Sequence, residues 1–201
     1  MLKTIQGHDT GIWSLEFSAN GKIFASGSRD KTVKLWKPDG ALLTPLQGHD
    51  AAVWDVAFSP DSRAIASAGA DNTTLLWKTE NAFQRTIHGL TNITLKLLFS
   101  KDGAIIAAAG NDKTLKLWHL DGTPLRTINA HDVAAGRIDL SPDGSTLASV
   151  SEDKTLKLWH LDGTLQRVFK DATTALISVA FIRVAPSLPQ PEMTKPSSFG
   201  I

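Results

Sequence analysis

The chain is built on an internal repeat of 41 residues. An aspartate recurs at this spacing, and a tryptophan six positions later recurs with it, as Asp30, Asp71, Asp112, Asp153 and Trp36, Trp77, Trp118, Trp159. No insertion or deletion interrupts the register, and the segment DKTLKLWHLDGT occurs twice without a mismatch, at 112–123 and 153–164. A fixed period of this length indicates a repeat architecture, in which each copy folds as one unit and buries its apolar face against the next.

Each copy is predicted to form four short strands. In the first copy these strands span 12–17, 23–28, 32–36 and 42–47, separated by turns at Asn20-Gly21 and Asp39-Gly40. Such dipeptides tolerate the positive φ angles of tight hairpin turns. No stretch keeps a 3.6-residue apolar period over three turns, so we predict no helix. The sequence therefore predicts an all-β chain of four-stranded antiparallel units.

Four residues of the repeat carry a resemblance to a known family. Gly7-His8 opens the period, Asp30 lies in the turn before the third strand, and Trp36 ends that strand. This pattern resembles the WD-repeat β-propellers, including multi-repeat members from bacteria, whose blades have four strands and about 40 to 45 residues. The resemblance covers roughly residues 2–181 and implies a β-propeller with four complete blades and a partial fifth. One departure is that the aspartate expected after the tryptophan is replaced, by Lys37, Lys78, His119 and His160.

The resemblance also implies a hydrogen-bonded set of four side chains in each blade, here called a tetrad. Its members are a histidine, a serine, the turn aspartate and the tryptophan: His8, Ser26, Asp30, Trp36; His49, Ser67, Asp71, Trp77; and His131, Ser149, Asp153, Trp159. An indole N–H can donate to the hydroxyl, the hydroxyl to the imidazole, and the other imidazole nitrogen to the carboxylate. Ser, His and Asp also make hydrolase triads, but a triad is needed once, in a cleft. We therefore interpret the recurring set as structural, and name no catalytic residue.

The third copy departs from this pattern. Leu90 replaces the histidine and Ala108 replaces the serine, while Asp112 and Trp118 remain. We predict that this blade is held by packing alone and opens more easily than its neighbours.

Five positions are candidates for binding a partner: Trp13, Arg29, Trp54, Asn111 and Glu152. In the family, partners bind the face that bears the loops entering each blade and the turns between the second and third strands. Arg29, Asn111 and Glu152 precede the turn aspartate and vary between copies, which fits either recognition or drift at solvated sites. The two tryptophans fit either an interface anchor or packing between blades.

Charge and composition exclude several function classes. The net charge is +1, with 21 basic and 20 acidic residues and no basic block, so neither nucleic acid nor a membrane is an expected partner. Without cysteine there is no disulfide or thiolate site, and the histidines lie 41 residues apart rather than at metal-ligand spacing. We expect no metal and no cofactor. The polar start of the chain lacks the apolar core of a secretion signal, so we expect a cytoplasmic protein.

The two ends depart from the repeat. Leu2–Gln6 matches the fourth strand of a unit, and Ala175–Phe181 matches the first strand of a fifth. We therefore divide the chain into a propeller over 1–182 and a degenerate, proline-rich tail over 183–201. A shifted reading frame of the tail can spell IASAGDDKTVKLWD, with the repeat's aspartate and tryptophan at positions 194 and 200. We hypothesise that a frameshift near 182–185 scrambled a fifth repeat, which the coding DNA would test.

The sequence thus favours a non-enzymatic scaffold for binding proteins. Two alternatives remain open. One is a fragment of a larger regulatory WD-repeat protein without independent function. The other is an enzyme or ligand-binding propeller with a site in the central channel, where Glu16, Asp55, Lys96 and Asp139 are the charged candidates. Exposed blade edges would also allow a homodimer.

Overall fold

The computed structural model describes residues 4–80, 82–88 and 92–182, and this part of the chain contains sixteen strands and no helix. No helix that could span a membrane occurs in these ranges. The strands form four separate sheets, each of four antiparallel strands in sequence order, which confirms the predicted unit.

Blade 1 comprises β1 (Ile12–Phe17), β2 (Phe24–Ser28), β3 (Val33–Trp36) and β4 (Leu42–Leu46). Blade 2 comprises β5 (Val53–Phe58), β6 (Ala64–Gly69), β7 (Thr74–Lys78) and β8 (Ala82–Ile87). Blade 3 comprises β9 (Thr94–Phe99), β10 (Ile105–Gly110), β11 (Thr114–His119) and β12 (Pro124–Asn129). Blade 4 comprises β13 (Ala135–Leu140), β14 (Thr146–Ser151), β15 (Leu156–His160) and β16 (Leu165–Phe169).

The hairpin turns follow the chemistry of their residues. Between β9 and β10, Gly103 has a φ of 73°, which costs glycine little because it has no Cβ. Beside it, Ser100 Oγ accepts a hydrogen bond from the N–H of Ile105 and donates one to Asp102. The Ser-x-Asp-Gly pattern therefore closes the turn and fixes the pairing of the two strands.

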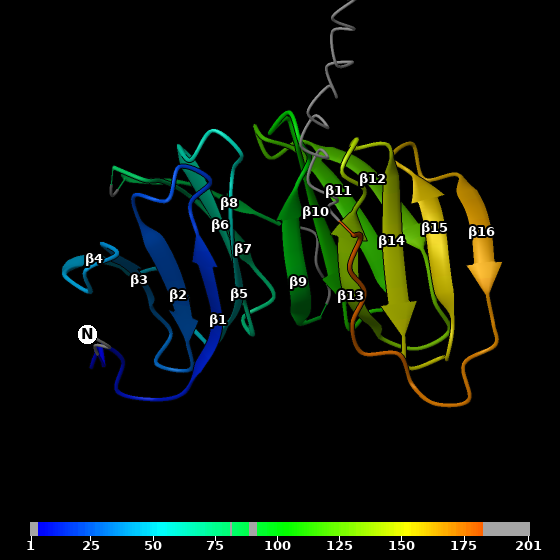
Figure 1. Cartoon of the computed structure of the whole chain (residues 1–201), viewed down its shortest axis with the longest axis horizontal. Coiled ribbons are helices and arrows are strands. Elements are labelled where there is room, and N and C mark those ends of the chain that lie inside the picture. The colour runs from blue at the N-terminus through cyan, green and yellow to red at the C-terminus, as the bar shows by residue number, and fades with distance from the viewer. Residues whose placement is uncertain (1–3, 81, 89–91, 183–201) are drawn as a thin grey trace, which may run out of the picture.

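The blades pack in chain order through their first strands. β1 lies beside β5, β5 beside β9, and β9 beside β13 (Figure 1). Each interface is apolar: between blades 1 and 2, for example, Val33 and Leu35 belong to one buried cluster with Val53, Val56 and Phe58. Corresponding clusters fill the two other interfaces. The repeated sequence therefore produces one interface three times.

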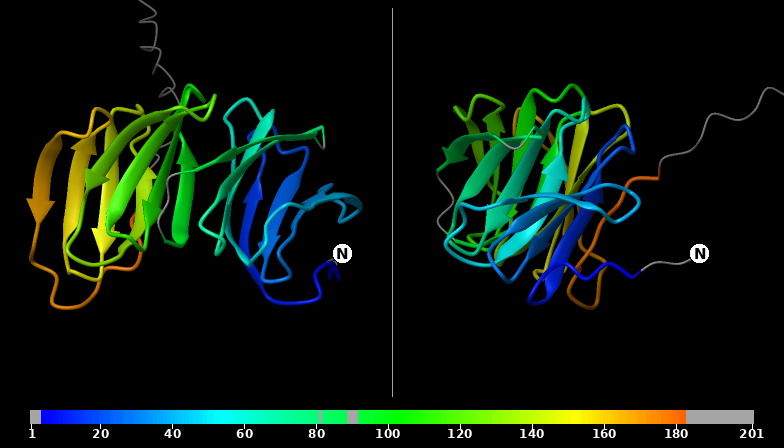
Figure 2. Two further views of the ribbon diagram at one scale, coloured as in Figure 1. Left: turned by 180° about the vertical axis from the view of Figure 1, so that it is seen from behind. Right: turned by 90° about the vertical axis from the view of Figure 1, so that its left-hand side faces the viewer.

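The series of blades is open. β1 and β13, its first and last inner strands, do not pack against each other, and blades 1 and 4 lie at opposite ends of the molecule (Figures 1 and 2). Leu15 on β1 is 54% exposed, whereas its counterpart Val56 on β5 is 0% exposed. Among the described residues, the four blades thus form an arc whose blade 1 face is uncovered and whose blade 4 face is covered only in part, by residues 175–182.

The two ends of the chain differ from the sequence prediction. The described part of Leu2–Gln6, residues 4–6, forms no strand, because no neighbouring sheet edge is present to pair with it. Ala175–Phe181 is likewise not paired as a strand, but it runs beside blade 4: the N–H of Leu176 donates to the Ser151 carbonyl, and that of Phe181 to Asp139. Both the tail over 183–201 and the frameshift hypothesis lie outside the described residues.

Candidate functional site

The structure brings together the four tetrad side chains in blades 1, 2 and 4. In blade 2, Trp77 Nε1 donates to Ser67 Oγ at 2.9 Å, and Ser67 Oγ lies 2.8 Å from His49 Nε2. His49 Nδ1 lies 2.9 Å from Asp71 Oδ2. The corresponding distances in blades 1 and 4 agree within 0.1 Å. The tetrad joins the loop that enters the blade to the turn between its second and third strands.

Burial separates these tetrads from a catalytic triad. Ser67 and Ser149 are 0% exposed and Ser26 is 1% exposed, so no substrate reaches their hydroxyls. Each hydroxyl also accepts the indole N–H of its tryptophan. A nucleophile needs access to a reacting carbon and an oxyanion site, and these serines are enclosed by their own sheet.

Electrostatics favour a charged aspartate in all three tetrads, because the pKa of each is lowered, and a neutral His131 in blade 4. Burial acts to raise the pKa of Asp153, but hydrogen bonds from Thr155, the backbone of Asp132 and His131 outweigh it and lower the pKa to about 2. Asp30 likewise has a pKa of about 2, because the hydrogen bonds from Thr32 and His8 outweigh burial. Burial lowers the pKa of His131, against the opposing effect of Asp153.

Blade 3 keeps polar contacts despite lacking the serine of the tetrad. Ala108 has no hydroxyl to offer Trp118, and Leu90 lies outside the described residues. Asp112, however, accepts hydrogen bonds from the backbone and hydroxyl of Thr114 and from Lys116 Nζ at 3.1 Å. The prediction that this blade is held by packing alone is therefore wrong for the turn, although the buried part of the tetrad is missing.

Two lysines of the third strands have a role that the sequence did not suggest. Lys34 Nζ donates to the carbonyl of Gly7, and Lys157 Nζ donates to that of Ala130. Each bond spans 27 residues and ties the third strand to the loop that enters the blade. The signal was present in the sequence, because lysine occupies this position of the repeat in three of the four copies. In the second copy the position holds Leu75.

A second polar network crosses from blade to blade along the inner strands. Asp55 on β5 is 2% exposed, and its carboxylate accepts hydrogen bonds from Ser14 Oγ on β1 and from the N–H of Leu97 on β9. It also forms an ion pair with Lys96 at 3.0 Å. Ser14, Asp55 and Lys96 are spaced by 41 residues, so one position of the repeat links three blades.

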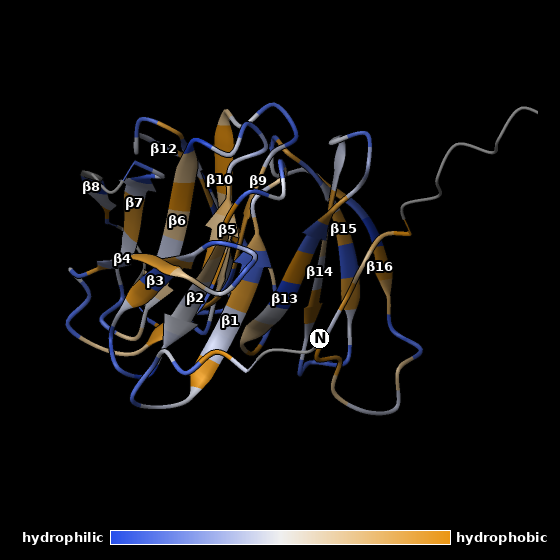
Figure 3. Cartoon of the chain, turned by 60° about the vertical axis from the view of Figure 1, so that its left-hand side comes forward, coloured by the Kyte–Doolittle hydropathy of each residue, from blue (hydrophilic) through white to orange (hydrophobic). Residues whose placement is uncertain are grey.

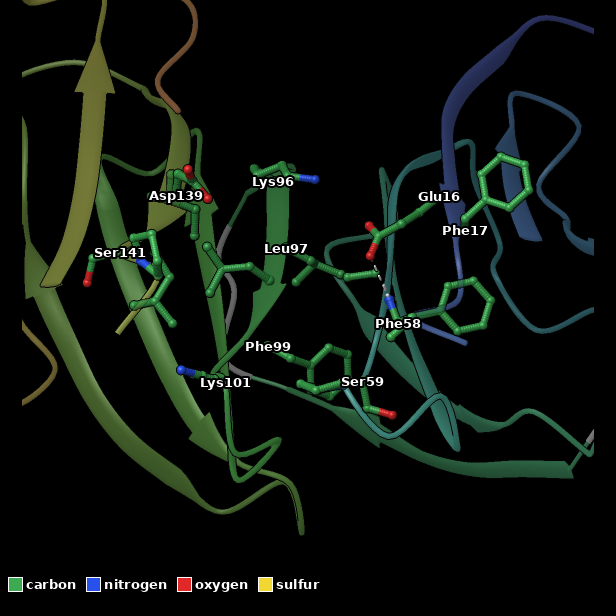
Figure 4. A pocket seen from close by; sticks show the side chains of 17 residues that line it. Glu16, Phe17, Phe58, Ser59, Lys96, Leu97, Phe99, Lys101, Asp139 and Ser141 are labelled. Carbon is green, nitrogen blue, oxygen red and sulfur yellow. Dashed lines mark hydrogen bonds between the residues drawn. The ribbon is translucent and has the colours of Figure 1, made fainter. Parts of the chain in front are cut away.

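The inner strands enclose a cleft of about 630 Å³. Glu16, Lys96 and Asp139 border it, above apolar residues that include Leu97 and Phe99 (Figure 4). The carboxylates are used in the fold: Glu16 Oε1 accepts from the N–H of Phe58, and Asp139 from that of Phe181. No cluster of three potential metal ligands occurs in the described ranges.

The five candidate binding residues lie at one end of the blades, here called the entry face and defined by 9–13, 28–31 and their counterparts. A hydrogen bond from the N–H of Arg29 to the carbonyl of Gly11 brings the two segments of blade 1 together. The equivalent backbone bond in blade 3 runs from the N–H of Asn111 to the carbonyl of Ile93. In blade 4 a side-chain bond joins the same two segments, from Ser151 Oγ to the Ala134 carbonyl. The side chains of Arg29, Asn111 and Glu152 are exposed, each on a separate blade.

Only the two tryptophans contact each other. Trp13 and Trp54 are the extra residues of β-bulges at the starts of β1 and β5, and a bulge redirects the side chain that it contains. Their ring centroids lie 4.9 Å apart at an interplanar angle of 31°, so they pack between blades. Trp13 nevertheless remains 52% exposed, whereas Trp54 is half-buried and its indole N–H lacks a hydrogen-bond partner.

Comparison with known proteins agrees with this architecture. Residues 1–188 match a family model described as the first β-propeller of IFT122. The Periodic tryptophan protein 2 homolog of Schizosaccharomyces pombe is 47% identical over 36 residues, and the U3 small nucleolar RNA-associated protein 12 of Saccharomyces cerevisiae is 51% identical over 37. Each match covers 18% of this chain and 4% of the relative. The Vegetative incompatibility protein HET-E-1 of Podospora anserina is 50% identical over 34 residues, 17% of this chain and 2% of that protein. The family model, the 41-residue repeat and the four-stranded blades together show that the chain belongs to the WD-repeat β-propeller family.

Proposed function

We propose that the chain is a non-enzymatic scaffold that binds a protein partner through its entry face. The observation that carries this proposal is the Trp13–Trp54 pair. Trp54 supports the ring of Trp13 from the neighbouring blade, while half of the Trp13 surface stays open to solvent. A large aromatic side chain held in place before binding is the kind of residue that dominates protein interfaces.

Charged and polar residues occupy the same face in blades 1, 3 and 4. Arg29 belongs to the same blade as Trp13, and its turn is bonded to the loop before β1. Asn111 and Glu152 occupy the matching positions of blades 3 and 4. Residues that differ at matching positions of a common scaffold suit recognition of one partner, with an apolar centre and a polar rim.

A ligand site in the cleft between the inner strands has weaker support. Asp55 and Lys96 pair with each other, and Glu16 and Asp139 accept backbone hydrogen bonds from the next blade or from 175–181. These charges hold the arc together. The buried tetrad serines give no nucleophile, so the geometry favours binding over catalysis.

The test is selection of binding peptides from a displayed library, followed by affinity measurement with purified variants. Trp13→Ala should weaken the binding of the selected peptides by about tenfold or more, with Trp13→Phe intermediate. Lys22→Ala, in the exposed turn at the other end of β1, is the matched control and should bind as the wild type does. Equal binding by wild type and Trp13→Ala would refute the entry face as the binding surface.

A further inference from the structure

The face of blade 1 that points away from blade 2, here called the outer face, presents a row of apolar side chains on β1. In the other blades the matching side chains are buried. Ile12, Leu15 and Phe17 on β1 are 53%, 54% and 54% exposed, and β1 lies in front of the other inner strands in Figure 3. The counterparts on β5, Val53, Val56 and Phe58, are 0%, 0% and 6% exposed because they pack on blade 1. The row on β1 therefore has the composition of an interface between blades, but none of the four described blades covers it.

The outer face of blade 4, which points away from blade 3, is complementary to the apolar row on β1. Leu115 and Leu117 on β11 are 0% exposed, and they pack against Ala135, Ile138 and Leu140 of the next blade. Their counterparts on β15, Leu156 and Leu158, come from the identical segment DKTLKLW but are only half-buried. Blade 4 thus carries the same surface that receives the inner strand of a following blade elsewhere in the chain.

The segment 175–182 shows what this surface receives. Leu176, Val179 and Phe181 are less exposed than the residues between them, and they lie 41 residues after Ala135, Ile138 and Leu140. The Phe181 N–H donates to Asp139 at 2.6 Å, as the Phe58 N–H donates to Glu16 at 3.2 Å at the same positions of the repeat, in both cases across 42 residues. The segment therefore occupies the place of the next inner strand, without strand pairing of its own.

β1 has the same pattern as this segment. Ile12, Leu15 and Phe17 lie at the repeat positions of Leu176, Val179 and Phe181, so phenylalanine is the last apolar residue of the pattern in both. β1, however, belongs to a complete four-stranded sheet, whereas 175–182 is a single segment without strand pairing. A complete blade would cover Leu156 and Leu158, which the single segment leaves half-exposed.

We propose that the arc associates head to tail with a second copy of itself: β1 of one copy displaces the segment 175–182 from blade 4 of the other. The Phe17 N–H of the incoming copy then takes the place of the Phe181 N–H at Asp139. If the same contact forms at both junctions, two arcs close into a ring of eight blades, within the four to eight typical of propellers. The contact is heterologous, because it joins two different faces. The proposal rests on the blade interfaces and is independent of the entry face.

The association is tested by light scattering and sedimentation equilibrium of the full chain over a wide range of concentrations. We expect a species of twice the 21.6 kDa chain mass, in equilibrium with the monomer. Leu15→Asp disables the blade 1 face and Leu158→Asp the blade 4 face, so each variant alone should raise the dissociation constant by about tenfold or more. Val133→Asp, an exposed apolar position outside both faces, is the control and should associate as the wild type does.

Mixing the variants distinguishes this geometry from other modes of association. Leu15→Asp keeps its blade 4 face and Leu158→Asp keeps its blade 1 face, so an equimolar mixture should recover a dimer with one intact junction. Recovery also shows that both variants are folded, and Leu158→Gln is the milder second variant. Phe181→Ala should strengthen association of the otherwise unchanged chain, because it weakens the competing segment. A monomeric wild type, a mixture that stays monomeric, or no effect of Phe181→Ala would overturn the proposal.

Discussion

The carboxylate of Asp55 lies 3.0 Å from Lys96 Nζ, and the two residues occupy the same position of successive repeats. Asp55 is buried, whereas the Lys96 side chain is 25% exposed. Because the carboxylate also accepts hydrogen bonds from Ser14 and the backbone of Leu97, it joins three blades at one point.

We therefore expect unequal effects when the two partners are removed. Asp55→Ala should destabilise the chain by roughly 3 kcal/mol, because it leaves a serine hydroxyl, a backbone N–H and an ammonium group without their acceptor. Lys96→Met should cost only about 1 kcal/mol, since the carboxylate keeps two donors. Urea unfolding of both variants measures the difference, and a larger loss for Lys96→Met than for Asp55→Ala would contradict the assigned network.

The interface between blades 2 and 3 contains two buried threonines that should be replaceable to advantage. Thr74 and Thr94 are both 0% exposed, and neither hydroxyl has a hydrogen-bond partner. The matching positions between blades 1 and 2 hold Val33 and Val53. Thr74→Val and Thr94→Val should each stabilise the chain by about 1 kcal/mol, because an unpaired buried hydroxyl costs about 1–3 kcal/mol.

Thermal and urea unfolding of these two variants provide the measurement. Thr10→Val, at an exposed threonine whose hydroxyl lies 3.4 Å from Ser28 Oγ, is a control in which no gain is expected. Destabilisation by both buried valines would mean that the threonine hydroxyls are satisfied in solution.

Stability should fall on acidification in two stages. Burial holds the folded pKa of His131 below its ordinary value of 6.5, so protonation favours the unfolded chain as the pH drops below that value. The carboxylates of Asp30 and Asp153 have folded pKa values of about 2, below the unfolded value near 3.9. Their contribution is complete above the unfolded pKa and is lost as the pH falls toward 2.

Urea midpoints measured between neutral pH and about pH 3 test both stages. His131→Asn should remove part of the loss that begins below pH 6.5 and leave the later stage intact. A midpoint that rises on acidification would contradict a neutral His131 and charged Asp30 and Asp153.

The period alone predicted the strands and blades, because each copy's local pattern decides its own hairpins. The tetrad members came from the resemblance to WD-repeat propellers, carried onto the matching positions around Asp30, Asp71 and Asp153. Contacts between different copies of the repeat could not be predicted from the sequence. The spacing of Asp55 and Lys96 shows that they are equivalent, but only the arrangement of the inner strands shows that they touch. The roles of Lys34 and Lys157 were missed because an alternating charge on a strand also fits a solvated face.

The prediction for the first residues failed for a related reason. Leu2–Gln6 resembles an outer strand, but a strand forms only where a sheet edge is present to accept it. No described sheet edge lies beside residues 4–6, so their backbone has no strand to pair with.

The recurring His, Ser, Asp and Trp are held here to stabilise the fold within each blade rather than to perform catalysis. Hydrogen exchange followed by mass spectrometry tests this role within one molecule, because blade 3 lacks the tetrad serine and blade 2 has it. Ser67→Ala is the matched variant that removes the same hydroxyl from blade 2. We predict faster amide exchange in residues 93–129 than in 53–88, and acceleration of 53–88 in Ser67→Ala. Equal or slower exchange in 93–129, with no change in Ser67→Ala, would contradict the structural role of the tetrads.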